Sequence, residues 1–347
     1  MTEKVKIKED MNVWDAKTGA PVSKSRRSFL ANAGMYGVGL AGSALLGACS
    51  DSDSFAQDGD DPNTVVINGP SDQAVLNFAL NLEYLEAEYY LRALTGSGLQ
   101  DGDRGMNPGD VTVKDNPMVN FQTPLIARYA AEIASDELAH VKFLRSALGS
   151  GAVAAPQINL QTSFNTAASA AGLGDSFDPF ANELNFLIGA FIFEDAGVTA
   201  YKGGSPFIRN RTFLEAAAGL LSVEAYHAGL VRTVLESRGD EIFTGSTTVR
   251  DVVDMISGAR DSVDGDDDLD QGIGENTSVT IYGTDYDSTN IVPTDMNGLT
   301  FSRSPFQVHN IVYLTPMAVS PSEGSVPDTG FFPMGTNGTL TASADNS

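Results

Sequence analysis

Two short segments of this chain carry residue types that bind metal ions. Glu137 precedes His140 by three positions, and Glu224 precedes His227 by the same spacing. Both segments lie in stretches whose apolar residues recur with the helical period, so the carboxylate and the imidazole of each pair project from one helix face. The chain contains three histidines, and the two pairs use two of them. Each pair therefore offers an oxygen and a nitrogen ligand on the same side of a helix.

Long helices must position these pairs. Apolar periodicity and end signals predict four, over residues 71–94, 123–149, 179–202 and 210–238. The first contains Glu83, and in the third Glu194 follows the nearly all-apolar run 186–193, which predicts a buried carboxylate. A helix of this length spans roughly 35 Å at about 1.5 Å per residue, which suits a four-helix bundle. The long link 150–177, with a short helix predicted near 166–171, can cross from one end of such a bundle to the other.

The predicted helices together supply four carboxylates and two imidazoles: Glu83, Glu137, His140, Glu194, Glu224 and His227. A dinuclear carboxylate centre inside a bundle needs this inventory, and hard oxygen ligands with one imidazole per ion suit Fe or Mn. A single Glu-x-x-His pair is more often a solvated helix face or a local hydrogen-bonded pair. Two pairs on separate apolar helices favour metal instead, because burying an unpaired charge costs several kcal/mol. The predicted cofactors are therefore two Fe or two Mn ions.

The same segments resemble the ferritin-like superfamily. The resemblance covers about residues 71–240 and rests on the paired Glu-x-x-His pattern. Residues 81–88 and 193–197 look like the branch that includes plant desiccation-related proteins. The resemblance implies an all-α fold, a ferritin-like four-helix bundle, with redox chemistry on peroxide, dioxygen or Fe(II).

Two further residues acquire roles through this resemblance. Asp136 precedes Glu137 as in the Asp-Glu-x-x-His of bacterioferritin-like proteins, which implies that it orients a histidine ligand. Tyr90 follows Glu83 by seven residues, which implies a hydrogen-bond partner beside the metals. These two are the candidate catalytic side chains, and the alternatives are a solvated helix residue and a core tyrosine. The Tyr90 spacing also favours Glu83 as the first helix's ligand over Glu86, which shares its face.

The N-terminal segment has the features of an export signal. Residues 25–30 read SRRSFL, a twin-arginine pattern, and the weakly apolar stretch 31–48 ends in a lipobox-like sequence at Cys49, the only cysteine. We expect residues 1–48 to be a signal peptide and residues 49–70 to be a flexible tether. The pattern predicts a bacterial cell-envelope lipoprotein, periplasmic or on the outer surface, held to the membrane by its lipid. The alternative is an ordinary signal peptide followed by a core cysteine.

Residues 241–347 are predicted to form a long C-terminal extension. It begins with a short amphipathic helix over 248–259, and from residue 261 onward the helical periodicity fails. Strand-like runs at 278–282 and 308–314 interrupt this Gly- and Asp-rich segment. We expect it to lie irregularly on the bundle or to be partly disordered.

Other parts of the sequence favour simpler interpretations. The segment Asp264–Asp270, with Glu275, resembles an EF-hand calcium loop, but Leu269 stands at the sixth position, where a glycine is required. A plain acidic turn is therefore predicted. His309 has no Glu-x-x-His partner and is predicted to be an ordinary surface or packed histidine. The net charge of −24 argues against a nucleic-acid partner, because no basic patch can replace phosphate counterions.

The predicted protein is thus an exported four-helix bundle with a long irregular C-terminal extension, whose partners are metal ions and small oxidants. A manganese catalase-like centre would disproportionate peroxide, whereas a ferroxidase-like centre would oxidise Fe(II). The alternative is a non-catalytic metal-binding or structural envelope protein linked to stress or desiccation, because a fold alone does not determine function.

Overall fold

The structure, a computed structural model, describes residues 13–14, 21–22 and 69–346 of the chain. The chain divides into two units, residues 1–69 and 70–347. In the first, β1 (Val13–Trp14) and β2 (Pro21–Val22) pair antiparallel. The twin-arginine segment, Cys49 and most of the predicted tether lie outside the described residues.

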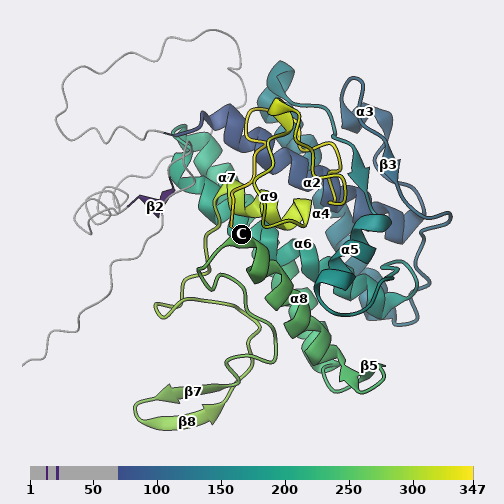
Figure 1. Cartoon of the computed structure of the whole chain (residues 1–347), viewed down its shortest axis with the longest axis vertical. Helices are drawn as coiled ribbons and strands as arrows, with labels where there is room; N and C mark the ends of the chain where they lie inside the picture. The colour runs from purple at the N-terminus through teal and green to yellow at the C-terminus, as the bar shows by residue number, and fades with distance from the viewer. Residues whose placement is uncertain (1–12, 15–20, 23–68, 347) are drawn as a thin grey trace, which may run out of the picture. The chain divides into compact units, whose positions relative to one another are not determined.

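The second unit contains the predicted four-helix bundle, which confirms the all-α fold class (Figure 1). Its long helices are α2 (Asp72–Thr95), α4 (Pro124–Leu148), α6 (Glu183–Gly204) and α7 (Arg211–Ser237). Helix α2 packs mainly against α4 and α6 mainly against α7, and α2 also contacts α6. Two helix pairs therefore join face to face around one interior.

Short elements connect these helices. Between α2 and α4 lie α3 (Asp101–Arg104) and β3 (Val111–Thr112); between α4 and α6 lie η2 (Gly149–Gly151), β4 (Ile158–Asn159) and α5 (Thr162–Ala170). β3 and β4 pair in parallel. The link between α4 and α6 thus joins the two helix pairs and includes the short helix expected there.

Side-chain caps fix where the long helices begin. Ser71 accepts from the backbone N–H of Ala74 at the start of α2, as its sequence position predicts. The third helix begins later than the predicted residue 179, because the Asn182 side chain caps it by accepting from the backbone N–H groups of Leu184 and Asn185. It also continues through Gly203, where a Cβ would lie 1.8 Å from the carbonyl oxygen of Arg303. The glycine therefore permits close packing of the extension rather than ending the helix.

The two inner helices are buried on all sides. Every residue from 74 to 90 of α2 and from 186 to 201 of α6 is buried, whereas α4 and α7 each keep an exposed face. The C-terminal extension supplies part of this cover through α8 (Val249–Asp264) and α9 (Pro305–Tyr313), which both contact α6. The interior between α2 and α6 is consequently separated from water.

The extension lies on the bundle in a defined conformation. β5 (Ile242–Thr244) pairs with β6 (Thr247–Thr248), and β7 (Ser278–Ile281), predicted as a strand, pairs with β8 (Thr284–Asp287) in a hairpin that projects from the helices (Figure 1). A final 3-10 turn is η4 (Pro321–Glu323). The Asn81 side chain of α2 bonds both backbone groups of Asn337, which ties the last residues to the bundle.

The strand predicted at 308–314 was wrong, because these residues form most of α9. Ser304 and Gln307 form a reciprocal capping box, and Pro305 occupies the first helical turn. These start signals, together with burial of the helix, override the β-branched composition of the run. His309 lies within α9, fully buried, with its Nε2 2.8 Å from the Thr336 hydroxyl, and burial lowers its pKa to about 3. It is therefore a neutral, packed histidine.

The predicted plain acidic turn was also wrong for two of its residues. Asp264 and Asp270 are buried and ion-paired with Arg303, at 2.5 and 2.9 Å. Asp270 also binds Arg260 at 2.7 Å. Asp195 of α6 binds Arg260, and Arg232 of α7 binds Asp195. The ion pairs thus form a chain of buried charges of alternating sign: Arg232, Asp195, Arg260, Asp270, Arg303 and Asp264. We call this chain the arginine–aspartate network; it joins the extension to the bundle.

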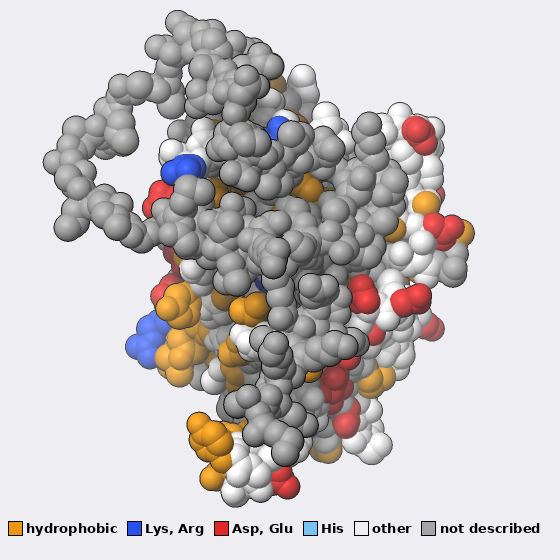
Figure 2. Space-filling model, turned by 90° about the vertical axis from the view of Figure 1, so that its left-hand side faces the viewer, with side chains coloured by type: hydrophobic (Ala, Val, Ile, Leu, Met, Phe, Trp, Pro, Cys, Tyr) orange, Lys and Arg blue, Asp and Glu red, His pale blue; other side chains and the backbone are white. Residues whose placement is uncertain are grey.

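Among the charged side chains on the coloured part of the surface in Figure 2, acidic ones are more abundant than basic ones, in keeping with the net charge of −24. Within the described residues, no helix combines the length and the apolar character needed to cross a bilayer.

Candidate metal centre

The bundle brings all six predicted ligands together in its interior. They form two groups whose candidate ligand atoms lie within 4.8 Å of one another: Glu83, Glu137, His140 and Glu224 in one, and Glu137, Glu194 and His227 in the other. Glu137 belongs to both groups. One ligand or pair thus comes from each of the four long helices, as the sequence predicts.

Both histidines direct the same ring nitrogen to the carboxylates. His140 Nδ1 lies 3.1 Å from Glu83 Oε2 and 3.5 Å from Glu224 Oε1. His227 Nδ1 lies 3.0 Å from Glu137 Oε1 and 3.7 Å from Glu194 Oε2. Because Glu and His lie three residues apart on α4 and on α7, helix geometry places each pair on the interior face.

The cluster contains more buried polar atoms than hydrogen bonds within the protein satisfy. Both carboxylate oxygens of Glu137 and of Glu224 are buried and form no hydrogen bond of normal geometry, although three of the four lie 3.0–3.5 Å from a histidine Nδ1. Burial, and then the Glu224 carboxylate, raise the pKa of Glu137 well above its usual value, and burial does the same for Glu194. Such groups are costly to bury unless cations pair with them. The orphaned oxygens and the donor set of four carboxylates and two imidazoles fit two Fe or Mn ions.

Two buried tyrosines bind the outer ligands across the bundle. The Tyr90 hydroxyl of α2 donates to Glu194 of α6, and the Tyr201 hydroxyl of α6 donates to Glu83 of α2. Burial raises the pKa of both phenols well above the usual value, so both keep the proton they donate. Tyr90 was predicted to be a hydrogen-bond partner beside the metal site, whereas Tyr201 was not predicted. Its signal was present, because Tyr201 follows Glu194 by the same seven residues.

Asp136 lies behind one histidine, on the side away from the cluster. Its Oδ2 is 3.2 Å from His227 Nε2, so it orients the histidine of α7 rather than His140 of its own motif. Its side chain is 42% exposed, so this carboxylate is in contact with solvent. The corresponding position before Glu224 is Val223, so α7 provides no similar carboxylate for His140.

Glu86, the rejected alternative to Glu83, lies beside the cluster but in neither group. It is buried, and burial followed by the Glu224 charge raises its pKa well above the usual value. Glu86 Oε1 and Glu224 Oε2 lie 3.3 and 2.7 Å from the point that a Cβ on Gly197 would occupy. Gly197 stands three residues after Glu194, where α4 and α7 carry their histidines. The missing side chain therefore leaves space on this side of the cluster.

Comparisons with known proteins agree with this geometry. Residues 71–237 match the ferritin-like domain family. The chain is 30% identical over 240 residues to the desiccation-related protein PCC13-62 of Craterostigma plantagineum, covering 68% of this chain and 75% of the relative. It is 26% identical over 320 residues to the ferritin-like catalase Nec2 of Nesocodon mauritianus, covering 90% of this chain and 98% of the relative.

Proposed function

This chain belongs to the ferritin-like superfamily, and on that premise we propose that its cluster holds two Fe or two Mn ions and disproportionates hydrogen peroxide. The observation that carries the proposal is the enclosed set of six ligands with orphaned carboxylate oxygens. Peroxide is favoured as the substrate because a relative that matches 90% of the chain is named a catalase.

The two groups of candidate ligand atoms support a division of the residues between two ions. Glu83 and His140 would hold one ion, Glu194 and His227 the other, and Glu137, which belongs to both groups, would link them. Glu224 would complete the first group. When bound, such a pair supplies two redox-active ions that together exchange two electrons with peroxide.

The surrounding residues hold this arrangement in place. The Tyr90 and Tyr201 hydroxyls each fix an outer carboxylate, on Glu194 and Glu83. Asp136 fixes the ring of His227 so that Nδ1 faces the carboxylates. Burial of α2 and α6 keeps bulk water away, which strengthens every electrostatic contact inside.

The metal content of the protein tests the proposal first. Protein purified from its own host should contain two Fe or two Mn per chain by elemental analysis, and Glu137→Ala/His227→Ala should lose them. Metal-loaded wild type should release O2 from peroxide. The variant should release it at least about 100-fold more slowly, because the loss of a carboxylate and an imidazole ligand strongly lowers metal affinity. Glu132→Ala/Glu215→Ala is the matched control, because these glutamates are exposed on the same two helices.

The other outcomes distinguish the alternatives. Oxidation of Fe(II) without O2 release from peroxide would replace the catalase with a ferroxidase. Bound metal without either reaction would favour a non-catalytic protein, as the name of the desiccation-related relative suggests. Absence of Fe and Mn from both proteins would contradict the metal centre.

We also propose export by the twin-arginine route and lipid attachment at Cys49, supported by the sequence pattern of residues 25–49. Cys49→Ser should move the protein from the membrane fraction to the soluble fraction of its host, because the acyl chains would be lost. Ser54→Ala, five residues further along, is the control and should stay with the membrane. Retention of Cys49→Ser in the membrane fraction would contradict lipid attachment.

A further inference from the structure

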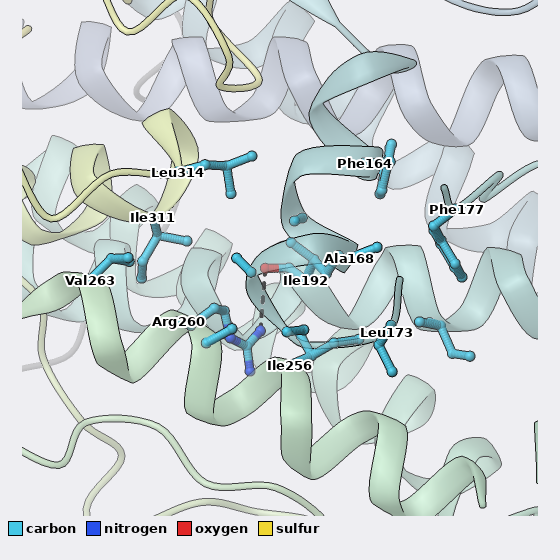
Figure 3. A pocket seen from close by; sticks show the side chains of 15 residues that line it. Phe164, Ala168, Leu173, Phe177, Ile192, Ile256, Arg260, Val263, Ile311 and Leu314 are labelled. Carbon is cyan, nitrogen blue, oxygen red and sulfur yellow. Dashed lines mark hydrogen bonds between the residues drawn. The ribbon is translucent and has the colours of Figure 1, made fainter. Parts of the chain in front are cut away.

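Two apolar cavities share part of their walls, and one of them reaches the surface while the other borders the candidate metal centre. The outer cavity, with about 580 Å³ of empty space including its mouth, lies among α5, α6, α8 and α9 (Figure 3). Its walls include the exposed Ala170 and the half-buried Ala167, so it reaches the surface of the molecule. Arg260 is its only charged wall residue. That guanidinium is already engaged with Asp195, Asp270 and backbone carbonyls.

The inner cavity is small and is walled entirely by buried residues of α2, α6 and the extension. Its walls include Glu86 and Gly197 and are otherwise apolar. Because a Cβ on Gly197 would lie only 2.7 Å from Glu224 Oε2, the inner cavity borders the ligand cluster.

Ile192 and Ile311 belong to the walls of both cavities. Figure 3 shows these two side chains on the wall of the outer cavity, one from α6 and one from α9. Both are buried, at 6% and 2% exposure. They therefore form the partition between the outer and the inner space.

We propose that the two cavities form an apolar passage for dioxygen between solvent and the metal centre, with Ile192 and Ile311 at its narrow point. The proposal rests on the proposed function, in which dioxygen is the product. An ion, or peroxide with its hydrogen-bonding groups, would lose hydration on walls that offer few free polar partners. Dioxygen loses almost nothing there, because it is small, uncharged and apolar.

The passage also gives the extension a role in the chemistry. Helix α9 and Phe331, both from the extension, complete the inner cavity over the open face at Gly197. A bare bundle would expose that face to water. The extension replaces the water with an apolar space that admits a neutral gas.

Xenon, a neutral apolar atom, can test the passage in metal-free full-length protein. NMR of dissolved 129Xe should show two bound populations that exchange with solvent, and crystals pressurised with xenon should show one site in each cavity. Ile311→Phe and Ala167→Leu should each slow exchange into the inner cavity about tenfold, because close-packed interiors respond to single added groups. Ile311→Leu conserves volume and should behave as wild type.

The outcomes separate this proposal from the proposed function. Xenon in the inner cavity with slowed exchange in the two variants supports the passage, even if peroxide is not turned over. Absence of xenon from the inner cavity, or unchanged exchange in both variants, overturns it, even if peroxide turnover is normal. The Ala167→Leu variant keeps the test valid if Ile311→Phe fails to fold, because Ala167 is only half-buried and a larger side chain there should be tolerated. If the metal centre turns over peroxide, both variants should also lower the maximal rate of O2 release.

Discussion

If the cluster holds the proposed metal ions, removing them with a chelator should destabilise the bundle and make its stability fall as the pH rises. Without cations, burial raises the pKa values of Glu137, Glu194 and Glu224, so the folded protein retains protons that the unfolded chain releases above about pH 4.5. Because the folded state then binds more protons than the unfolded state, the free energy of unfolding decreases as the pH rises above that value.

The histidines act in the same direction, and one glutamate acts in the other. Despite burial, the neighbouring carboxylates raise the pKa values of His140 and His227, and the stability that their protonation contributes is lost as the pH rises through the folded values. The pKa of Glu83 is lowered: burial opposes this, but His140 outweighs it. Its contribution is lost only as the pH falls below about 4.5. Between pH 5 and 8 the net trend is therefore downward.

Bound cations should remove this trend, because they pair with the ionised carboxylates in place of protons. Free metal at 1,000 times the dissociation constant would stabilise the fold by about 4 kcal/mol per site. Thermal unfolding at pH 5 and pH 8, with metal and with chelator, measures both effects. Glu137→Gln should flatten the pH trend of the metal-free protein, whereas the exposed Glu132→Gln should not. Equal pH trends with and without metal would refute the expectation.

The clustering of the six candidate ligands was predictable because the geometry within each helix is local. The spacing of Glu137 and His140 on one helix fixes their common face, and the apolar residues around them indicate burial. The same holds for Tyr201, whose spacing from Glu194 repeats that of Tyr90 from Glu83. These features depend on helical periodicity within one element, which a sequence displays directly.

Contacts between elements were less predictable. Asp136 orients His227, which lies 91 positions away, because the two helix pairs enclose one interior and bring side chains of α4 and α7 together there. The β-branched residues of α9 favour a strand locally, but the Ser304 capping box and burial against α6 and α8 stabilise a helix instead. Sequence periodicity describes neither effect, since both arise from tertiary packing.

The acidic segment that begins at the last residue of α8 shows the same limit for charges. Asp264, Asp270 and their neighbours read as a solvated acidic turn, because their counter-charges are dispersed along the chain. Asp270 binds Arg260, ten positions earlier, and Arg303, 33 positions later. Folding collects these charges into the arginine–aspartate network, with three arginines balanced by three aspartates.

Removing the Asp270 carboxylate, in the middle of the arginine–aspartate network, should lower the free energy of unfolding more than any substitution of an exposed residue in the same loop. Asp270→Ala removes the shared partner of Arg260 and Arg303, which are 4% and 1% exposed. The two buried guanidinium groups would lose their common carboxylate, and leaving a buried charge uncompensated costs about 3–5 kcal/mol. Urea unfolding should show this loss, and hydrogen exchange should show faster exchange of the α9 amides, because the extension loses a link to the bundle.

The control lies two residues away in the same segment. Asp268 is exposed and takes part in none of the ion pairs of the described residues, so Asp268→Ala should change the unfolding free energy by no more than about 0.5 kcal/mol. Both variants lower the acidic charge by one, so any difference between them reports the network rather than net charge. Equal, small losses would mean that apolar packing of α9 on α6 suffices to hold the extension. A large loss in Asp270→Ala alone would show that the ion pairs fix the extension over the inner cavity.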